Sequence, residues 1–252
     1  MAADSILLAS LVAVAYVGII YAVSYLACPH SWQDRDHPSV IKARIVAVLF
    51  MAMAVRILIR SRPGSVSISE VGWTLLLLAP LVYVKVCAQM ERLPREITGK
   101  GSLSPLFMVM RAQWATACEM VREKDLEVIR NVLVGPFAEE RVFRQTLFAI
   151  LPAAQFRVWS ALIFASAHAH GLLLGEAIEG VLVQFLFTLV FGYYVGGVYM
   201  QSRSVITCFA VHSLCNLVGF PDPDDFFKLS RRRRIVAGVW LLVASLLYAL
   251  SL

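Results

Sequence analysis

The chain has 252 residues and a formal net charge of +6; apolar types make up 59% of it, and its mean hydropathy is +0.72. Soluble domains contain about 45–50% apolar residues, so the composition excludes an ordinary water-soluble domain and indicates a membrane protein. The basic residues lie in short patches between apolar runs, which favours a membrane surface over nucleic acid as their partner. The five cysteines have no paired spacing, so we expect neither a disulfide framework nor a thiolate zinc site.

Three apolar runs in residues 1–103 are long enough to be anchor helices, since a helix across the bilayer core needs about 20 apolar residues. They are Ile6–Ala27, Val40–Ile59 and Val71–Ala88. The first lacks a basic n-region and is too long for a signal peptide, so we expect it to be retained. Residues 104–130 mix acidic and basic side chains with apolar ones, which predicts an amphipathic helix at the membrane surface.

Five further apolar runs follow: Asn131–Leu151, Arg157–Leu174, Ile178–Met200, Val205–Phe220 and Ile235–Leu252. The chain is therefore predicted to be an all-α, polytopic integral membrane protein with about eight transmembrane helices. Residues 131–221 hold the helices with candidate catalytic groups, and 235–252 form the final span. No linker or repeat divides residues 1–252, so we expect a single membrane-embedded domain.

Basic residues also predict the orientation of these spans. With eight spans, the first, third and seventh loops carry most of the arginines and lysines, including the run Arg231–Arg234. The opposite loops hold only Arg60, Arg62, Arg157 and Arg203. The positive-inside rule therefore places the odd-numbered loops in the cytosol.

Polar side chains interrupt three of the predicted spans. An ionisable group at membrane depth costs several kcal/mol unless it faces the protein interior and finds a partner. Under the predicted orientation these groups lie toward the cytosolic ends of their helices, so we expect a shared polar cavity that opens toward the cytosol. The residues concerned are Glu139, Glu140, Arg144, His168, His212 and Asn216.

Helical geometry, at about 100° per residue, suggests how these groups pair. Glu140 and Arg144 have opposite charges four residues apart and suit an ion pair that orients the carboxylate. Glu139 points about 100° away from Glu140 and stays available to His168 on a neighbouring helix. His168 and His170 differ by about 200°, so only one of them can face the shared interior.

Purely structural roles are also open to these residues. The Glu140–Arg144 pair could serve stability alone, and His212 with Asn216 could join helices by hydrogen bonds, as polar side chains commonly do in membranes. Gly192 and Gly196 have small-xxx-small spacing, which predicts close approach of two helices.

Taken together, the polar segments resemble a known family. The patterns Glu139-Glu140-x-x-x-Arg144, Phe164-x-x-x-His168 and His212-x-x-x-Asn216 occur in the order typical of the CAAX prenyl protease 2 family, part of the wider family of CAAX proteases and bacteriocin-processing proteins. The stretches GPFAEERVFRQ, ASAHAHG, VFGYYVGG and HSLCNLVGFP resemble its eukaryotic, endoplasmic-reticulum branch. Arg141 departs from the pattern, because eukaryotic members often have an apolar residue there.

This resemblance implies an intramembrane endopeptidase of the glutamate type, a hydrolase that removes the C-terminal tripeptide from prenylated CAAX proteins such as Ras-like small GTPases. It implies a multi-pass protein of the endoplasmic reticulum membrane whose active site faces the cytosol. The expected partners are prenylated substrates and the lipid bilayer, with no nucleic acid, cofactor or metal. The catalytic residues that it implies are Glu139, Glu140, Arg144, His168, His212 and Asn216.

The same residues support hydrolysis on chemical grounds. Amide hydrolysis needs an activated water and stabilisation of the tetrahedral oxyanion. The sequence contains no G-x-S-x-G nucleophile elbow and no H-E-x-x-H zinc motif. Glu139 beside His168 can deprotonate a water, and His212 and Asn216, which share a helix face, can donate hydrogen bonds to the oxyanion.

Two alternatives remain open at this point. The first is a metal-dependent membrane protease, because Glu139 or Glu140 with His168 and His212 would make a set of ligands of the kind used by catalytic zinc. The second is a non-enzymatic carrier or scaffold whose polar cluster conducts protons or binds a lipid. Carriers often contain inverted repeats, and this sequence shows none, which favours the enzyme.

Overall fold

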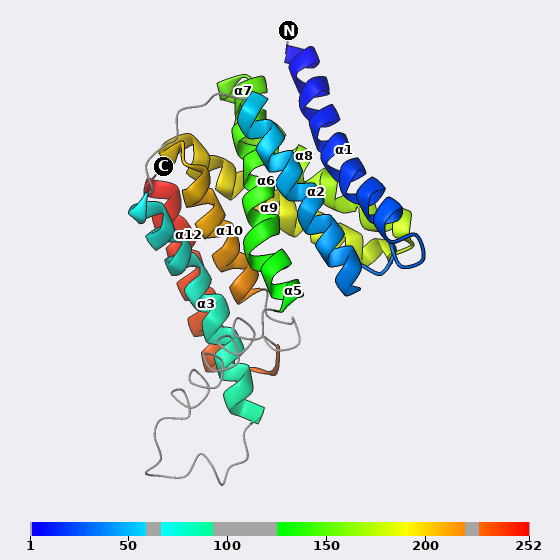
Figure 1. Cartoon of the computed structure of the whole chain (residues 1–252). Helices are drawn as coiled ribbons and strands as arrows, with labels where there is room; N and C mark the ends of the chain where they lie inside the picture. Colours follow the sequence, from blue (N-terminus) through cyan, green and yellow to red (C-terminus); the bar gives the residue numbers. More distant parts are fainter. Residues whose placement is uncertain (1, 59–66, 93–124, 220–226, 252) are drawn as a thin grey trace. The chain divides into compact units, whose positions relative to one another are not determined.

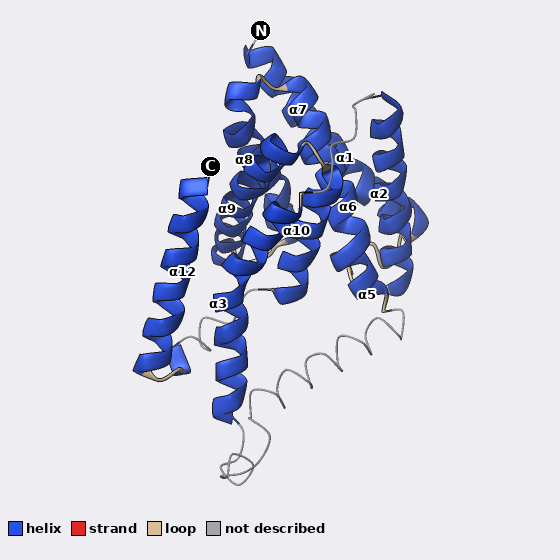
Figure 2. Cartoon of the chain, turned by 90° about the vertical axis from the view of Figure 1, so that its left-hand side faces the viewer, coloured by secondary structure: helices blue, strands red, loops and turns tan. Residues whose placement is uncertain are grey.

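The computed structural model describes residues 2–58, 67–92, 125–219 and 227–251, and these residues form helices and connecting loops with no strand (Figures 1 and 2). Apolar segments fold in this way because a helix satisfies its own backbone hydrogen bonds where water is absent. The predicted all-α class is therefore confirmed. Most of the predicted surface helix, residues 104–124, lies outside the described residues.

Four helices among the described residues are long and apolar enough to cross a membrane: Ala3–Ala27, Pro38–Val55, Ile68–Ala88 and Ile178–Ser202. They belong to α1 (Ala2–Ala27), α2 (Pro38–Leu58), α3 (Ile68–Arg92) and α9 (Ile178–Ser202). These helices coincide with the three predicted anchors and with the predicted span Ile178–Met200. The other four predicted spans stay predictions.

The outer faces of these long helices are apolar. Val14 on α1 is 68% exposed, Ile57 on α2 is 75% exposed and Val190 on α9 is 71% exposed. Large apolar side chains that are exposed along whole helices suit contact with lipid better than contact with water. The chain is therefore a membrane protein by the character of its surface as well as by the length of its helices.

The predicted span Asn131–Leu151 lies in a continuous helical rod that contains two π-helical segments. It runs through α5 (Leu126–Val128), the π-helical η1 (Ile129–Val134), α6 (Gly135–Glu140), the π-helical η2 (Arg141–Thr146) and α7 (Leu147–Ile150). The rod ends where Leu151 adopts an extended backbone (ψ 145°), because Pro152 disfavours helical geometry at the residue before it. π-Helical turns within α-helices occur frequently at functional sites.

The next two helices form a closely packed pair. α8 (Ala153–His168) is followed by the short 3₁₀ helix η3 (Ala169–Leu174), so the predicted span Arg157–Leu174 keeps α-helical winding only as far as His168. α8 packs along α9. A Cβ atom added at Gly192 would lie 3.1 Å from the Cα of Ala161, and this narrow space confirms the close helix approach predicted from the glycine spacing.

The chain divides into two compact units. The first comprises Met1–Ile68 and Leu126–Ser213 and contains α1, α2, the rod, α8, α9 and most of α10 (Val205–Val218). Its apolar core includes residues from all of these helices, among them Ala13, Val142, Phe143, Phe164, Val195 and Val211. Glu140, Arg144 and His212 are buried in the same unit.

The second unit comprises Ser69–Asp125 and Leu214–Leu252, which include α3, the end of α10 and α12 (Arg231–Ser251). A small apolar core joins α3 to α12 through Val84, Cys87 and Ala237. The Lys85 ammonium donates a hydrogen bond to the Val218 carbonyl at the end of α10. The arginine run that the sequence analysis singled out forms the first turn of α12.

Candidate active site

Two adjacent carboxylates occupy the end of α6, immediately before the π-helical turn η2. Glu140 is fully buried, whereas the side chain of Glu139 keeps 21% of its surface exposed. Neighbouring residues on a helix point about 100° apart, so the two carboxylates enter different surroundings. One is enclosed by protein and the other is reachable from outside the core.

The buried carboxylate of Glu140 is held on both of its oxygens. Its Oε2 lies 2.9 Å from the Nε of Arg144, and neither side chain has any exposed surface. The ion pair predicted from the i, i+4 spacing is therefore present. Its Oε1 accepts a hydrogen bond from the Nδ1 of His212 at 2.8 Å. Ionised groups this deep in a protein persist only when they are paired in this way.

His212, on α10, lies between the two carboxylates. Because a carboxylate can only accept, the Nδ1 of His212 carries the proton in its bond to Glu140. The other ring nitrogen, Nε2, lies 3.9 Å from the Oε2 of Glu139. His212 was predicted to donate to the oxyanion, and its approach to both glutamates was not predicted.

His168 is the last residue of α8 and is half-buried. Its Nδ1 lies 2.9 Å from the Phe164 carbonyl, which can only accept, so this nitrogen donates and the Nε2 of the neutral ring holds a lone pair. Among the described residues, His168 makes no direct hydrogen bond or ion pair with Glu139. A water molecule between the two side chains would be needed to join them.

Phe164 is the residue that the site's polar groups share. It is 1% exposed, and its ring centroid lies 4.6 Å from that of His168 and 6.2 Å from that of His212. The Arg144 guanidinium lies over the same ring, with its Cζ 4.8 Å from the centroid. A cation above an aromatic face is attracted by the quadrupole of the ring, so Phe164 helps to hold the buried arginine as well as both histidines.

His170 belongs to a different environment. Its Nδ1 lies 2.8 Å from the Ala167 carbonyl, and its ring packs against Tyr21 of α1 at a centroid distance of 5.5 Å. The rings of His168 and His170 thus have different neighbours, in agreement with their predicted difference in helical phase.

Asn216 follows His212 by one turn of α10, and the helix is continuous over both residues. The shared helix face predicted from their spacing is therefore preserved. Asn216 belongs to the second unit, whereas the other site residues belong to the first.

Tyr16 on α1 is part of these surroundings, although the sequence analysis did not single it out. It is 4% exposed, and its ring makes an edge-to-face contact with Phe143 at 5.5 Å. The carboxylates of Glu139 and Glu140 are among the charged groups near its hydroxyl. The available signal was a phenol in an otherwise apolar span, because a buried tyrosine usually has a polar partner for its hydroxyl.

The ligand set considered for zinc is not assembled. Within the part of the chain that the structure describes, no three His, Cys, Asp or Glu side chains lie close enough together to hold a metal ion. The geometry of these residues therefore does not fit a two-histidine, one-carboxylate metal centre.

Comparisons with known proteins identify relatives of this chain. Residues 124–218, which contain all six candidate residues, match the model of the Rce1-like family of type II CAAX prenyl endopeptidases. The chain is related to the CAAX prenyl proteases. CAAX prenyl protease 2 of Homo sapiens is 26% identical over 91% of this chain and 78% of its own length. A probable CAAX prenyl protease 2 of Schizosaccharomyces pombe is 26% identical over 80% of this chain and 78% of its own length.

The CAAX prenyl protease 2 of Arabidopsis thaliana is also 26% identical, over 58% of this chain and 52% of its own length. The family match and these relatives confirm the resemblance predicted from the three motifs. No solved structure matches the chain.

Proposed function

We propose that this chain is an intramembrane endopeptidase that removes the C-terminal tripeptide from prenylated CAAX proteins, with Glu139 activating the attacking water. Its relationship to CAAX prenyl protease 2 makes it a CAAX endopeptidase and a hydrolase of peptide bonds. The mechanism rests on the residues of the site.

The observation that carries this mechanism is the contrast between the two carboxylates. Glu140 has no exposed surface, and its two oxygens face Arg144 and His212, so water does not reach it. Glu139 is partly exposed, and the nearest histidine nitrogen is 3.9 Å away, which is too far for a direct hydrogen bond. Glu139 is therefore the carboxylate that can bind a water and take its proton.

The remaining residues have complementary roles in this mechanism. His168 offers the lone pair of its Nε2 to the same water, because its Nδ1 donates to the Phe164 carbonyl. His212, when its Nε2 also carries a proton, donates to the oxyanion of the tetrahedral intermediate. Asn216, one turn further along α10, supplies a second donor. Glu139 then passes the proton of the water to the leaving amine.

In the same proposal, the substrates are Ras-like small GTPases and other prenylated CAAX proteins, and the membrane is that of the endoplasmic reticulum. About eight spans surround a polar cavity that opens to the cytosol, and the chain works as one membrane-embedded domain. The prenyl group lies laterally among apolar helix surfaces, where each buried CH₂ contributes about 0.8 kcal/mol. The peptide reaches Glu139 from the cytosolic side.

A comparison of matched peptides tests this proposal. Purified protein in detergent is given the same CAAX peptide with a farnesylated or a free cysteine, and kcat/KM is measured for each. The proposal predicts that the farnesylated peptide is cleaved far more efficiently, because the lipid supplies most of the binding energy. Equal cleavage of both peptides would contradict the prenyl specificity and indicate a general membrane protease.

A further inference from the structure

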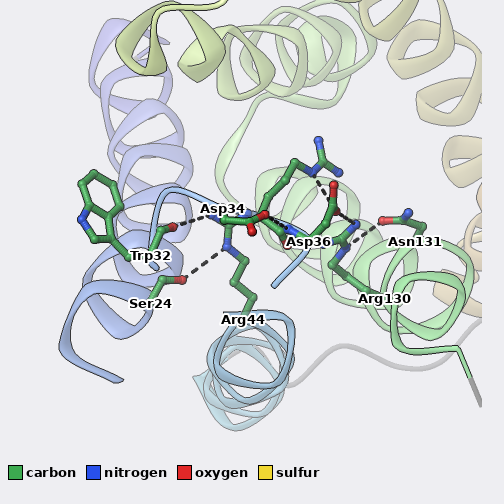
Figure 3. A network of polar contacts seen from close by, with 8 residues as sticks. Ser24, Trp32, Asp34, Asp36, Arg44, Arg130 and Asn131 are labelled. Atoms are coloured by element: carbon green, nitrogen blue, oxygen red, sulfur yellow. Dashed lines mark hydrogen bonds and ion pairs between the residues drawn. The ribbon is translucent and has the colours of Figure 1, made fainter. Parts of the chain in front are cut away.

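Three arginines gather around the loop that joins α1 to α2 (Figure 3). Arg130, from the start of the rod, lies with its Nη2 2.9 Å from the Oδ1 of Asp36, and the Nε of Arg35 is 3.7 Å from the same oxygen. Asp34 accepts a hydrogen bond from the backbone N–H of Asp36 at 3.0 Å. Arg35 and Arg130 thus share the Asp36 carboxylate. The third arginine, Arg44, does not form an ion pair with it.

The third arginine, Arg44 of α2, is half-buried; its hydrogen bonds among the described residues are to neutral groups, and the Asp36 carboxylate acts on it only at longer range. Its Nε lies 3.3 Å from the Ser24 hydroxyl and its Nη2 lies 3.5 Å from the Trp32 carbonyl, both at the long end of the hydrogen-bond range. Figure 3 shows the side chain rising from α2 toward these two residues. Among the described residues, no carboxylate lies within ion-pair distance of Arg44. A guanidinium in such surroundings is stabilised by an anion that reaches it.

Arg44 also lies near the end of the helix that carries His168. Its Cζ is 5.3 Å from the centroid of the Tyr21 ring, and that ring is 5.5 Å from the ring of His170. His170 follows His168 by two residues. Two successive contacts therefore join the Arg44 guanidinium to the segment that presents His168, within the same unit of the structure.

The substrate of the proposed reaction carries an anion that suits Arg44, its C-terminal α-carboxylate. A protease that releases a tripeptide must position the peptide bond three residues from the C-terminus of its substrate. The group that distinguishes this end of the substrate is the free α-carboxylate. Three extended residues span about 10 Å. Arg44 is joined to the segment after His168 by two side-chain contacts, of 5.3 Å to the Tyr21 ring and 5.5 Å from that ring to His170. A planar guanidinium can bind a carboxylate through two parallel hydrogen bonds.

We propose that Arg44 is the binding site for the C-terminal α-carboxylate of the substrate, with the ring of Tyr21 as its support. This inference rests on the proposed function, because it takes a peptide with a free C-terminus as the ligand. It makes Arg44 the residue that sets the position of the cut. In the absence of substrate, the loose bonds to Ser24 and Trp32 hold the guanidinium in place.

The test uses two farnesylated peptides that differ only at the C-terminus, one with a free carboxylate and one with a carboxamide. We measure kcat/KM for both with the wild-type protein, Arg44→Gln, Arg44→Lys and Lys42→Gln. Lys42 is exposed on the same helix and serves as the matched control. The wild type and Lys42→Gln should prefer the carboxylate by roughly tenfold to a hundredfold, the size expected for a hydrogen bond between charged groups.

Arg44→Gln should lose this preference, because it should slow cleavage of the carboxylate peptide only. Arg44→Lys should keep part of the preference, because an ammonium keeps the charge but lacks the paired donors of a guanidinium. An equal slowing of both peptides by Arg44→Gln would overturn the proposal and assign Arg44 to structure. A wild type that cleaves both peptides equally well would overturn it too, while leaving the prenyl-protease function standing. Cleavage of neither peptide would show that the proposed function itself is wrong.

An anionic lipid headgroup is the other source of a comparable charge. The same measurements in vesicles of phosphatidylcholine, with and without phosphatidylserine, separate the two ligands. Under the proposal, the loss caused by Arg44→Gln follows the peptide terminus and is the same in both kinds of vesicle. A loss that depends on phosphatidylserine and is the same for both peptides would overturn the proposal in favour of a headgroup site.

Discussion

His212 donates a hydrogen bond from its Nδ1 to the Oε1 of Glu140 over 2.8 Å, and this bond links α10 to the end of α6. The other oxygen of Glu140 is fixed by Arg144, so the histidine is oriented through an ion pair with no exposed surface. Its second nitrogen is thereby turned toward Glu139. Glu140 thus has a positioning role, which explains why a carboxylate with no access to water lies beside the candidate base.

Glu140→Leu should unfold the protein more readily than Glu139→Leu does. Removal of Glu140 leaves the buried Arg144 without its counter-charge, which costs about 3–5 kcal/mol, whereas Glu139 is partly exposed and has no close ion pair. Thermal unfolding in detergent measures this difference. The double variant Glu140→Leu/Arg144→Leu should recover most of the lost stability, since it removes both charges.

The double variant also separates stability from catalysis. It should stay inactive even though it folds, because His212 has lost the carboxylate that orients it. Recovery of activity together with stability would show that Glu140 and Arg144 serve the fold alone.

His168→Ala should be inactive and His170→Ala should keep most of its activity. The ring of His168 lies against Phe164, which also contacts His212, whereas the ring of His170 packs on Tyr21. Turnover of a farnesylated peptide by the two purified variants measures this. The reverse ranking would mean that His170 faces the reacting water.

His168 and His170 illustrate which features of the site can be predicted from the sequence. The phase difference between His168 and His170 and the Glu140–Arg144 pair were predicted from short spacings along one helical segment. They hold although His170 lies in the 3₁₀ helix η3 and Arg144 in the π-helical turn η2. Contacts between helices are different, because they depend on how each helix is rotated and shifted against its neighbours. The bond from His212 to Glu140 is such a contact, and the phase of residues along one helix does not determine which carboxylate His212 meets.

The π-helical turn η2 is a second reason why the site was only partly predictable. It begins at Arg141, directly after the two glutamates, and changes the winding of the rod there. Tyr16 was missed because it is one of three tyrosines in the span Ile6–Ala27, and each of them resembles a packing residue. Of the predicted spans without a counterpart among the long apolar helices, Asn131–Leu151 carries four charges, and Arg157–Leu174 and Val205–Phe220 coincide with the shorter helices α8 and α10.

His212→Gln should lower kcat strongly and change KM little. A donor to the oxyanion acts mainly in the transition state, and loss of one such donor typically lowers kcat by about a hundredfold to a thousandfold. Steady-state kinetics on a farnesylated peptide separate the two constants. A change in KM alone would remove His212 from the oxyanion role and make it a residue of substrate binding.

Gly192→Ala should destabilise the protein, and Gly180→Ala on the same helix should not. A Cβ at position 192 would lie 3.1 Å from the Cα of Ala161 and 3.3 Å from the Cδ1 of Phe164, whereas one at position 180 would meet nothing within 4 Å. Alanine at the open position should be neutral or favourable, since it is the better helix former. Thermal unfolding of both variants checks this.

The Gly192→Ala variant should also lose activity at temperatures where it is folded, because Phe164 supports both histidines and Arg144. Equal melting temperatures for Gly192→Ala and Gly180→Ala would contradict the close packing of α8 on α9.

The central claim is that Glu139 activates the water that releases a tripeptide from a prenylated C-terminus. The most direct measurement is mass spectrometry of a farnesylated CAAX peptide after incubation with wild-type protein or with Glu139→Ala, at matched amounts of folded protein. We predict the intact C-terminal tripeptide and the shortened farnesyl-cysteine product from the wild type, and neither from Glu139→Ala. Tripeptide release by Glu139→Ala at more than a small fraction of the wild-type rate would contradict the account.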